Sequence, residues 1–298
     1  MTVALGFQDW MKGVQSTMED ALASFLPPSS HIPSRLHEAM RYAALDGGKR
    51  VRPLLVFAAG EVFDAHPALL ARAGAAVEMI HAYSLVHDDM PCMDDDALRR
   101  GKPTVHVKYD EATALLVGDA LQSQAFIVLS EGEGGDASRR LDMLRLLARA
   151  SGSVGMCGGQ AIDLDSVGRS LSLAELENMH RLKTGALLRA SVLLGALAGK
   201  RLTPEETELL DAYSAAIGLA FQVVDDVLDA TADSATLGKT AGKDAADNKP
   251  TYVSILGLEE SRALAEKLRN DAHRALVPFG DKARRLRELA DLIVQRKA

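Results

Sequence analysis

The stretch LVHDDMPCMDDDALRRGKPT, residues 85–104, places five aspartates within nine positions at the end of an apolar run. They are Asp88, Asp89, Asp94, Asp95 and Asp96. Carboxylates this dense repel one another and resist transfer out of water, so a fold that gathers them near a cavity must supply counter-charge. Oxygen ligands favour hard cations, and Mg2+ typically binds through one or two carboxylates plus substrate phosphates. The run therefore indicates either a magnesium site or, as the alternative, a solvated acidic loop.

A second acidic run, FQVVDDVLD, covers residues 221–229 and also ends an apolar helical pattern. Asp225 and Asp229 are four residues apart, which puts both on one face of a helix, and Asp226 lies beside them. Two carboxylates placed in this way can share metal ions that bridge to a ligand. The sequence thus predicts two separate groups of carboxylates, one at the end of each apolar run.

The spacing within the first run predicts a break in its helix. Asp88 and Asp94 are six residues apart, which on an ideal helix is a rotation of about 240°, and Pro91 disfavours a helical conformation at Met90. The helix must therefore end or bulge here, and an irregular turn could bring Asp94 back toward Asp88. An exposed helix terminus is the alternative. It is less favoured, because acids at a helix C-terminus oppose the macrodipole unless cations neutralise them.

The rest of the chain indicates an all-α protein. Hydrophobic residues make up 47% of the 298 positions and aromatic residues only 4%, while Ala and Leu recur at helical spacing. The breaks are local Pro and Gly positions, and none resembles an interdomain linker, so we expect one domain, 1–298. The apolar periodicity predicts helices at about 5–25, 34–46, 50–63, 67–90, 111–131, 136–150, 172–199 and 204–230.

Composition also excludes several classes of protein. A net charge of -7 argues against nucleic acid as the main partner. Cys92 and Cys157 cannot form a disulfide framework, which fits a reducing compartment. The first residues lack the pattern of a signal peptide. The longest uncharged apolar stretch, Ala212–Val224, is shorter than the ~20 residues that a membrane span needs. We therefore expect a soluble cytoplasmic protein with no membrane partner.

Basic runs alternate with the acidic ones. GGKRVRP opens a helix at residues 47–53, RRGKP follows the first acidic run at 99–103, KTG lies at 183–185, and three lysines occur in the polar segment 231–250, which we interpret as a lid. Arginine forks and lysine charges together with Mg2+ are how proteins hold diphosphates. A single basic run is usually a solvated face, but this alternation favours a diphosphate site.

Taken together, these motifs resemble the trans-prenyl diphosphate synthase family. Residues 85–104 resemble its first aspartate-rich motif, in the bacterial form with four residues between Asp89 and Asp94, and 221–229 resemble the second. Residues 47–53, Gly159-Gln160, Lys183-Thr184 and 238–251 match further family blocks in order. The resemblance covers roughly 30–260 and implies a bundle of roughly ten core helices around a central cavity, together with a homodimer.

The resemblance also implies roles for individual residues. The family's Mg2+ ions, three per active site, would be held against the allylic diphosphate by Asp88, Asp94, Asp225 and Asp229, with Asp89 and Asp226 in support. The allylic diphosphate would be bound by Arg99, Lys183 and Lys239, with Lys249 closing from the lid and Thr184 and Gln222 placing oxygens near the carbocation. Isopentenyl diphosphate would be bound by Lys49, Arg52, His81 and Arg100.

Tyr83 is the predicted determinant of product length. It lies five residues before Asp88, a depth of about 7 to 8 Å along a helix, and the resemblance implies that a bulky aromatic residue here marks short-chain enzymes. Ser84 lies on the same helix face as Asp88 and is too small to stop a chain, whereas Tyr83 lies on the flank of that face and must reach inward. A core tyrosine with a bonded hydroxyl is the alternative for Tyr83, as an ordinary histidine is for His81.

The implied reaction joins isopentenyl diphosphate to dimethylallyl and then geranyl diphosphate, giving farnesyl diphosphate. A geranylgeranyl or longer-chain synthase of the same fold is the nearest rival. A class I terpene cyclase would usually replace the second aspartate motif, and a non-catalytic synthase subunit would typically lose aspartates. Both motifs are intact here.

Overall fold

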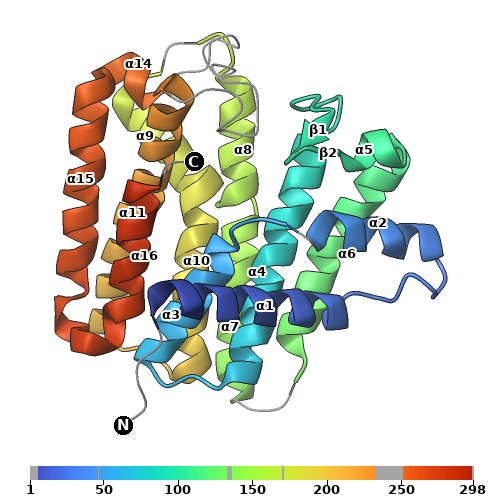
Figure 1. Cartoon of the computed structure of the whole chain (residues 1–298), viewed down its shortest axis with the longest axis horizontal. Helices are drawn as coiled ribbons and strands as arrows, with labels where there is room; N and C mark the ends of the chain where they lie inside the picture. Colours follow the sequence, from blue (N-terminus) through green and yellow to red (C-terminus); the bar gives the residue numbers. More distant parts are fainter. Residues whose placement is uncertain (1–5, 46, 133–135, 170, 232–250, 297–298) are drawn as a thin grey trace.

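The computed structural model describes residues 6–45, 47–132, 136–169, 171–231 and 251–296, and the described part is a bundle of α-helices (Figure 1). The helices of the first half are α1 (Phe7–Phe25), α2 (Ser34–Ala44), α3 (Val51–Val62), α4 (Pro67–Asp88), α5 (Val105–Lys108), α6 (Glu111–Ser130) and α7 (Ala137–Ser151). A short hairpin, β1 (Leu98–Arg99) and β2 (Lys102–Pro103), interrupts them.

The second half continues the bundle. Its elements are α8 (Met156–Asp165), α9 (Leu173–His180), the π-helical turn η1 (Arg181–Gly185), α10 (Ala186–Gly199), α11 (Pro204–Thr231), α14 (Tyr252–Leu256), α15 (Leu258–Ala275), the 3-10 turn η2 (Val277–Ala283) and α16 (Arg284–Gln295). The all-α prediction is confirmed. Each helix expected from periodicity is present, with ends shifted by a few residues.

Helix starts follow the local sequence. Asp110 caps α6 by accepting a hydrogen bond from the backbone N–H of Thr113, and Ser172 and Glu175 form a reciprocal capping box at α9. Such caps satisfy the amides that a helix N-terminus leaves without partners. Pro67 occupies the first turn of α4, where its missing N–H costs nothing.

Small residues let the central helices approach closely. A Cβ at Gly195 of α10 would lie 2.0 Å from the carbonyl oxygen of Val56 on α3, and one at Gly118 of α6 would lie 1.9 Å from Nε2 of His87 on α4. A side chain at Gly195 would force α10 and α3 apart, whereas one at Gly118 would displace the His87 ring. The core around α4 is therefore tightly packed, and this fixes the direction in which the end of α4 projects.

Two stretches are long and apolar enough to pass as membrane spans on length and composition: Glu111–Ser130 and the continuous Leu173–Gly199. About half of each tested window is buried inside the bundle, 44% and 56% respectively, as expected of core helices in a helical protein. The expectation from sequence had considered only uncharged stretches and found none long enough.

Both acidic motifs lie at the same end of the bundle. Helix α4 runs upward in Figure 1 and ends at Asp88, just before the β1–β2 hairpin, and the C-terminal end of α11 reaches the same upper end, close to α14. Helix α10, preceded by η1, lies between them. This arrangement brings motifs that are far apart in the sequence to one site.

Candidate active site

The first acidic motif folds back on itself as its spacing predicted. Helix α4 ends at Asp88, and the backbone N–H of Asp94 donates a 2.8 Å hydrogen bond to the carbonyl oxygen of Asp88. Burial is the main cause that raises the pKa of Asp88 to about 6, and Asp94 adds to the rise while Lys183 opposes it. An ionised carboxylate here is costly until a cation joins it.

Asp89 has its counter-charge within the protein. Its carboxylate is buried, and Arg99 on β1 donates to both oxygens, with Nη2 at 2.6 Å from Oδ1 and Nε at 2.9 Å from Oδ2. Two parallel hydrogen bonds of this kind fix both partners. Arg99 therefore stabilises the turn of the first acidic motif. Its positive charge is partly neutralised by Asp89, even with no diphosphate bound.

The second motif is anchored by residues from the C-terminal part of the chain. Asp226 accepts a 2.7 Å hydrogen bond from the backbone N–H of Tyr252, and Asp225 forms an ion pair with Arg296, Nη2 to Oδ1 2.6 Å. The Arg296 guanidinium also lies over the Phe221 ring at 3.9 Å. Sequence reasoning missed Arg296, because no local pattern links positions that are 71 residues apart.

The π-helical turn η1 places two predicted residues between the motifs. Lys183 Nζ lies 2.5 Å from Oδ2 of Asp163, and the Thr184 hydroxyl donates a 2.8 Å hydrogen bond to Oε1 of Gln222. π-Helical turns inside α-helices are frequent at functional sites. Thr184 and Gln222 are thus brought together as expected, although here they bond to each other.

Helix α8 supplies the residues that hold Lys183, and the sequence gave no expectation of this helix. A Cβ at Gly159 would lie 2.1 Å from the backbone nitrogen of Lys183, so only glycine lets α8 pack against η1. Gln160 follows it, and both polar atoms of its side-chain amide are buried with no hydrogen-bond partner among the described residues. A polar ligand in the cavity would satisfy them.

These elements enclose a cavity of about 350 Å3. Tyr83 is 8% exposed and lines the cavity, and burial is the main cause that raises the pKa of its hydroxyl, an effect that the nearby Gln122 amide partly offsets. The cavity is lined by Arg52, His81, Tyr83, Ser84, Leu85, His87, Asp88, Met93, Met156, Cys157, Gln160, Ala161, Leu164, Lys183 and Thr184.

Three of the four predicted isopentenyl diphosphate residues, Arg52, His81 and Arg100, form one basic cluster, whereas Lys49 lies near Arg296 and Asp225. Burial lowers the pKa of His81 well below its ordinary value, and the neighbouring arginines, Arg52 first, lower it further, so this imidazole is neutral near pH 7. The Nε of Arg52 is buried and has no hydrogen-bond partner in the described part of the chain. The Arg100 guanidinium packs on Gly48, where a Cβ would come within 2.6 Å of its Nη1. Positively charged side chains that repel one another, together with a buried N–H that has no acceptor, favour the binding of an anion.

Arg50 fixes the backbone of the basic cluster, and the sequence interpretation had given it no role. It adopts the left-handed conformation with φ 53°. Its buried guanidinium lies 2.7 Å from Glu78 on α4 and 2.6 Å from Glu19 on α1. This network connects the start of α3 to α1 and α4. Burial is the main cause that lowers the pKa of the adjacent Lys49.

Lys239 and Lys249 lie outside the described residues, as does most of the segment 231–250 interpreted as a lid. Their proposed roles therefore remain predictions.

The donor set fits Mg2+ that is shared with a ligand. Asp88, Asp94, Asp225 and Asp229 offer only oxygen atoms, the donors that hard cations prefer. Among the residues that the structure describes, no three carboxylate, imidazole or thiol side chains lie close enough to hold an ion by themselves. The carboxylates must therefore be completed by other oxygens, and Mg2+ is usually bound in this way, by one or two carboxylates and substrate phosphates.

Comparisons with known proteins agree with this site. The family model described as polyprenyl synthetase matches residues 33–277. A probable farnesyl diphosphate synthase of Sinorhizobium fredii is 52% identical over 94% of this chain and 85% of its own length. The farnesyl diphosphate synthase of Escherichia coli is 48% identical, with 98% of this chain and 99% of the relative covered.

Solved structures agree as well. The apo structure of an FPP/GFPP synthase from Zymomonas mobilis superposes with a TM-score of 0.88 at 44% identity, covering 97% of this chain and 98% of that one. A geranyltransferase from Helicobacter pylori, solved with magnesium and isoprenyl diphosphate, has a TM-score of 0.84 at 32% identity and 98% coverage of both chains. Two aspartate motifs at one end of an α-helical bundle, a basic cluster beside them and a family match over most of the length lead to one conclusion: the chain belongs to the polyprenyl synthetase family.

Proposed function

We propose that this protein is a farnesyl diphosphate synthase. It condenses isopentenyl diphosphate with dimethylallyl diphosphate and then with geranyl diphosphate, head to tail, and requires Mg2+. The observation that carries the proposal is the cavity that joins Asp88, Lys183 and Thr184 to Arg52 and His81. One cavity thus faces both the predicted allylic site and the predicted isopentenyl site.

The acidic and basic residues of the chain have different roles: the carboxylates bind metal ions, and the basic side chains bind the diphosphates. Asp88, Asp94, Asp225 and Asp229 would hold the Mg2+ ions, three by family resemblance, and these would supply positive charge that stabilises the leaving diphosphate. Lys183 would release Asp163 and bind that diphosphate instead. Arg52, Lys49 and Arg100 hold the isopentenyl diphosphate, and neutral His81 can donate a hydrogen bond to it.

Ionisation of the allylic diphosphate requires a site that excludes water, and it does not require a nucleophilic side chain. When the allylic C–O bond ionises, the Thr184 hydroxyl and the Gln222 amide oxygen, already 2.8 Å apart, orient their dipoles toward the cation. The isopentenyl double bond attacks that cation. The new carbocation that forms then loses a proton and becomes a neutral alkene. Lys239 and Lys249, which lie outside the described residues, would close over the reacting groups and exclude water.

Product length follows from the depth of the cavity. Tyr83 lines the same cavity as Asp88, and its side chain is almost fully buried. A fixed aromatic ring at this depth would stop the growing chain at fifteen carbons, whereas Ser84, whose hydroxyl donates to the His81 carbonyl, leaves room beside it. A longer-chain synthase is the second candidate, since the Zymomonas relative is named as an FPP/GFPP synthase.

A homodimer would cover an apolar surface on α6 and α7. Helix α6 is apolar around much of its circumference, yet Leu115, Leu116 and Ile127 are 49%, 54% and 45% exposed, and Leu141 of α7 is 55% exposed. Exposed apolar patches of this kind mark interaction surfaces in soluble proteins. We further propose that the chain forms one domain and works in the cytoplasm.

The experiment supplies purified protein with isopentenyl diphosphate and dimethylallyl diphosphate in the presence of Mg2+ and, in parallel, of excess chelator. Release of inorganic diphosphate with Mg2+ and its absence with chelator support the proposal. Equal release with chelator, or no release under either condition, contradicts it.

A further inference from the structure

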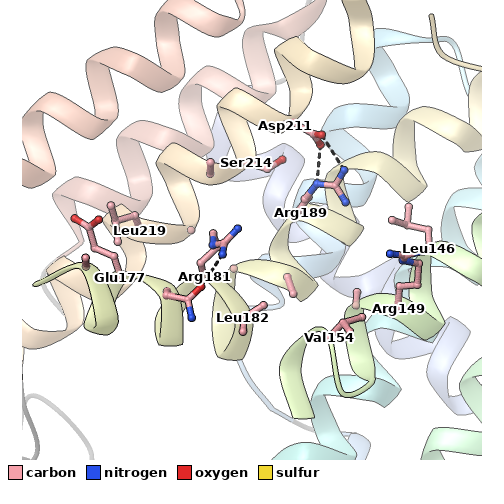
Figure 2. A pocket seen from close by; sticks show the side chains of 17 residues that line it. Leu146, Arg149, Val154, Glu177, Arg181, Leu182, Arg189, Asp211, Ser214 and Leu219 are labelled. Carbon is pink, nitrogen blue, oxygen red and sulfur yellow. Dashed lines mark hydrogen bonds and ion pairs between the residues drawn. The ribbon is translucent and has the colours of Figure 1, made fainter. Parts of the chain in front are cut away.

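A second cavity, of about 730 Å3, lies between α7, α9, α10 and α11 (Figure 2). It shares no lining residue with the cavity of the active site. Small and branched apolar residues make most of its wall, among them Leu146, Ala150, Leu182, Ala215, Gly218 and Leu219. Its volume lies within the range of about 300 to 1,000 Å3 that ligand pockets occupy.

Two guanidinium groups line this apolar cavity without a carboxylate partner. In the described part of the chain, Arg149 has no ion pair, and Arg181 contacts only the amide oxygen of Asn178, 2.6 Å from its Nη2. The third arginine, Arg189, is neutralised by two contacts to Asp211, as the dashed lines in Figure 2 show. Glu177 also lines the cavity, so its charged side chains leave a net charge of about one positive unit beside the apolar surface, which is complementary to an amphipathic anion.

We propose that this cavity is a second, regulatory ligand site that binds a phosphate carrying a linear apolar chain. The chain would lie along Leu146, Leu182 and Leu219, and the phosphate would bind one of the two unpaired guanidinium groups, Arg149 or Arg181, which lie on different parts of the wall (Figure 2). The reaction proposed above makes products of this class, so the regulatory part of the inference rests on the proposed function, whereas the binding part does not.

Two wall elements of the cavity also carry active-site residues. In η1, Arg181, Leu182 and Gly185 line the second cavity, while Lys183 and Thr184 line the first. Gly185 also meets α11, because a Cβ at Gly218 would lie 3.2 Å from its Cα. A ligand that presses on Leu182 or Gly185 thus acts on the turn that positions Lys183 and on the helix that carries the second acidic motif. Two ligands that bias one shared element change each other's affinity.

Binding is tested with farnesyl monophosphate as the probe and EDTA in the buffer, measured by titration calorimetry. Without divalent metal the aspartate motifs repel the anion, and excess isopentenyl diphosphate is added to occupy the basic cluster around Arg52, so the remaining binding reports the second site. The site predicts saturable binding of one probe per chain. Of Arg149→Gln and Arg181→Gln, the variant that removes the partner of the phosphate should weaken binding about tenfold, as expected for the loss of one charge-assisted hydrogen bond. Unchanged binding by both variants overturns the anion site. Inorganic phosphate should compete poorly because it lacks the chain.

Matched variants separate the cavity from the general surface. Ala215→Phe fills the cavity from an exposed position on α11 and should abolish binding, whereas Ala212→Phe, also exposed on α11 but outside the lining, should preserve it. Arg145→Gln on α7 is the charge control for Arg149. No binding by wild type, or equal binding by Ala215→Phe and Ala212→Phe, overturns the site. If wild type does not bind and Ala215→Phe alters the mass of the assembly, the cavity belongs to a subunit interface and the proposal is wrong.

Regulation is tested separately with Mg2+ present. Farnesyl monophosphate should change the kcat or the allylic KM of wild type in a way that excess isopentenyl diphosphate does not reverse. Ala215→Phe should keep the basal rate and lose that response. Unchanged kinetics at saturating probe, or an identical response from Ala215→Phe, contradicts the regulatory role. A protein with no prenyltransferase activity would contradict the proposed function, while the binding result in EDTA would still decide the site.

Discussion

The backbone N–H of Asp94 donates a 2.8 Å hydrogen bond to the carbonyl oxygen of Asp88, six residues earlier in the chain. This contact closes the turn after α4 and keeps Asp94 close enough to raise the pKa of Asp88, which lines the cavity. Asp95 takes the left-handed conformation, φ 51°, to complete the turn. The first motif is therefore a folded loop that presents carboxylates, and Pro91 marks where the helix ends.

Asp225→Ala should lower kcat by about 10²- to 10³-fold, the usual effect of losing one group that stabilises the transition state. The change also removes the ion pair with Arg296. Glu208→Ala, at an exposed position of the same helix, is the control and should leave the rate unchanged. Steady-state kinetics with saturating Mg2+ provides the measurement, and undiminished turnover by Asp225→Ala would rule out the two-motif mechanism.

Arg99→Ala should destabilise the fold by about 1 to 3 kcal/mol, because it leaves the buried carboxylate of Asp89 without its hydrogen-bond donor. Arg99→Lys keeps the charge but not the paired geometry, so its loss should be smaller. The double variant Asp89→Asn with Arg99→Ala should recover part of the stability. Urea unfolding at pH 7.5 measures all three, and an Arg99→Ala protein as stable as wild type would show that the pair contributes nothing to the fold.

His180→Phe should stabilise the protein at acidic pH. Burial, the main cause, lowers the pKa of His180 to about 4, and the ring stacks on Tyr252 with centroids 5.7 Å apart. Because the unfolded chain binds this proton more readily, stability from the neutral histidine is present above pH ~6.5 and is lost as pH falls toward 4.

Phenylalanine does not titrate and keeps the aromatic contact. From pH 7.5 to pH 5, wild type should lose about 2 kcal/mol more unfolding free energy than His180→Phe. Denaturant unfolding at the two pH values measures this difference, with the exposed His31→Asn as control. Parallel losses in wild type and His180→Phe would mean that His180 is not a buried neutral group.

Tyr83→Ala should open the cavity beside Asp88 and shift products from fifteen toward twenty carbons or more. Tyr83→Phe keeps the ring while losing the contact with Gln122, so its product should stay at fifteen carbons. Chromatography of the dephosphorylated products separates these lengths. A Tyr83→Ala enzyme that stops at fifteen carbons with normal activity would show that another residue forms the floor.

Much of the fold could be predicted because periodicity reports burial directly. The helices of 7–25, 67–88 and 204–231 each carry an apolar face or are buried throughout. Helix α8 was missed because its sequence, MCGGQAIDLD, contains Gly158 and Gly159, which normally weaken a helix. Those glycines serve packing against the preceding turn and η1 instead.

The residues that support the site were harder to predict than those that form it. Aspartate and lysine motifs are local in sequence, so their chemistry could be read directly. Asp163, Arg296 and Glu78 act through partners 20, 71 and 28 residues away. Only the tertiary fold creates those contacts. Similarly, the apolar periodicity of residues 172–199 predicts one helix. The π-helical turn η1 within it is visible only in the backbone hydrogen bonds of the structure.

The most direct test of the proposed function is the product formed by the wild-type protein. Purified enzyme is incubated with Mg2+, dimethylallyl diphosphate and an excess of isopentenyl diphosphate, and the dephosphorylated products are separated by chromatography over time. The proposal predicts that geranyl diphosphate appears first and is then consumed, and that farnesyl diphosphate accumulates as the end product. Accumulation of chains of twenty carbons or more, or of no prenyl product, would contradict it.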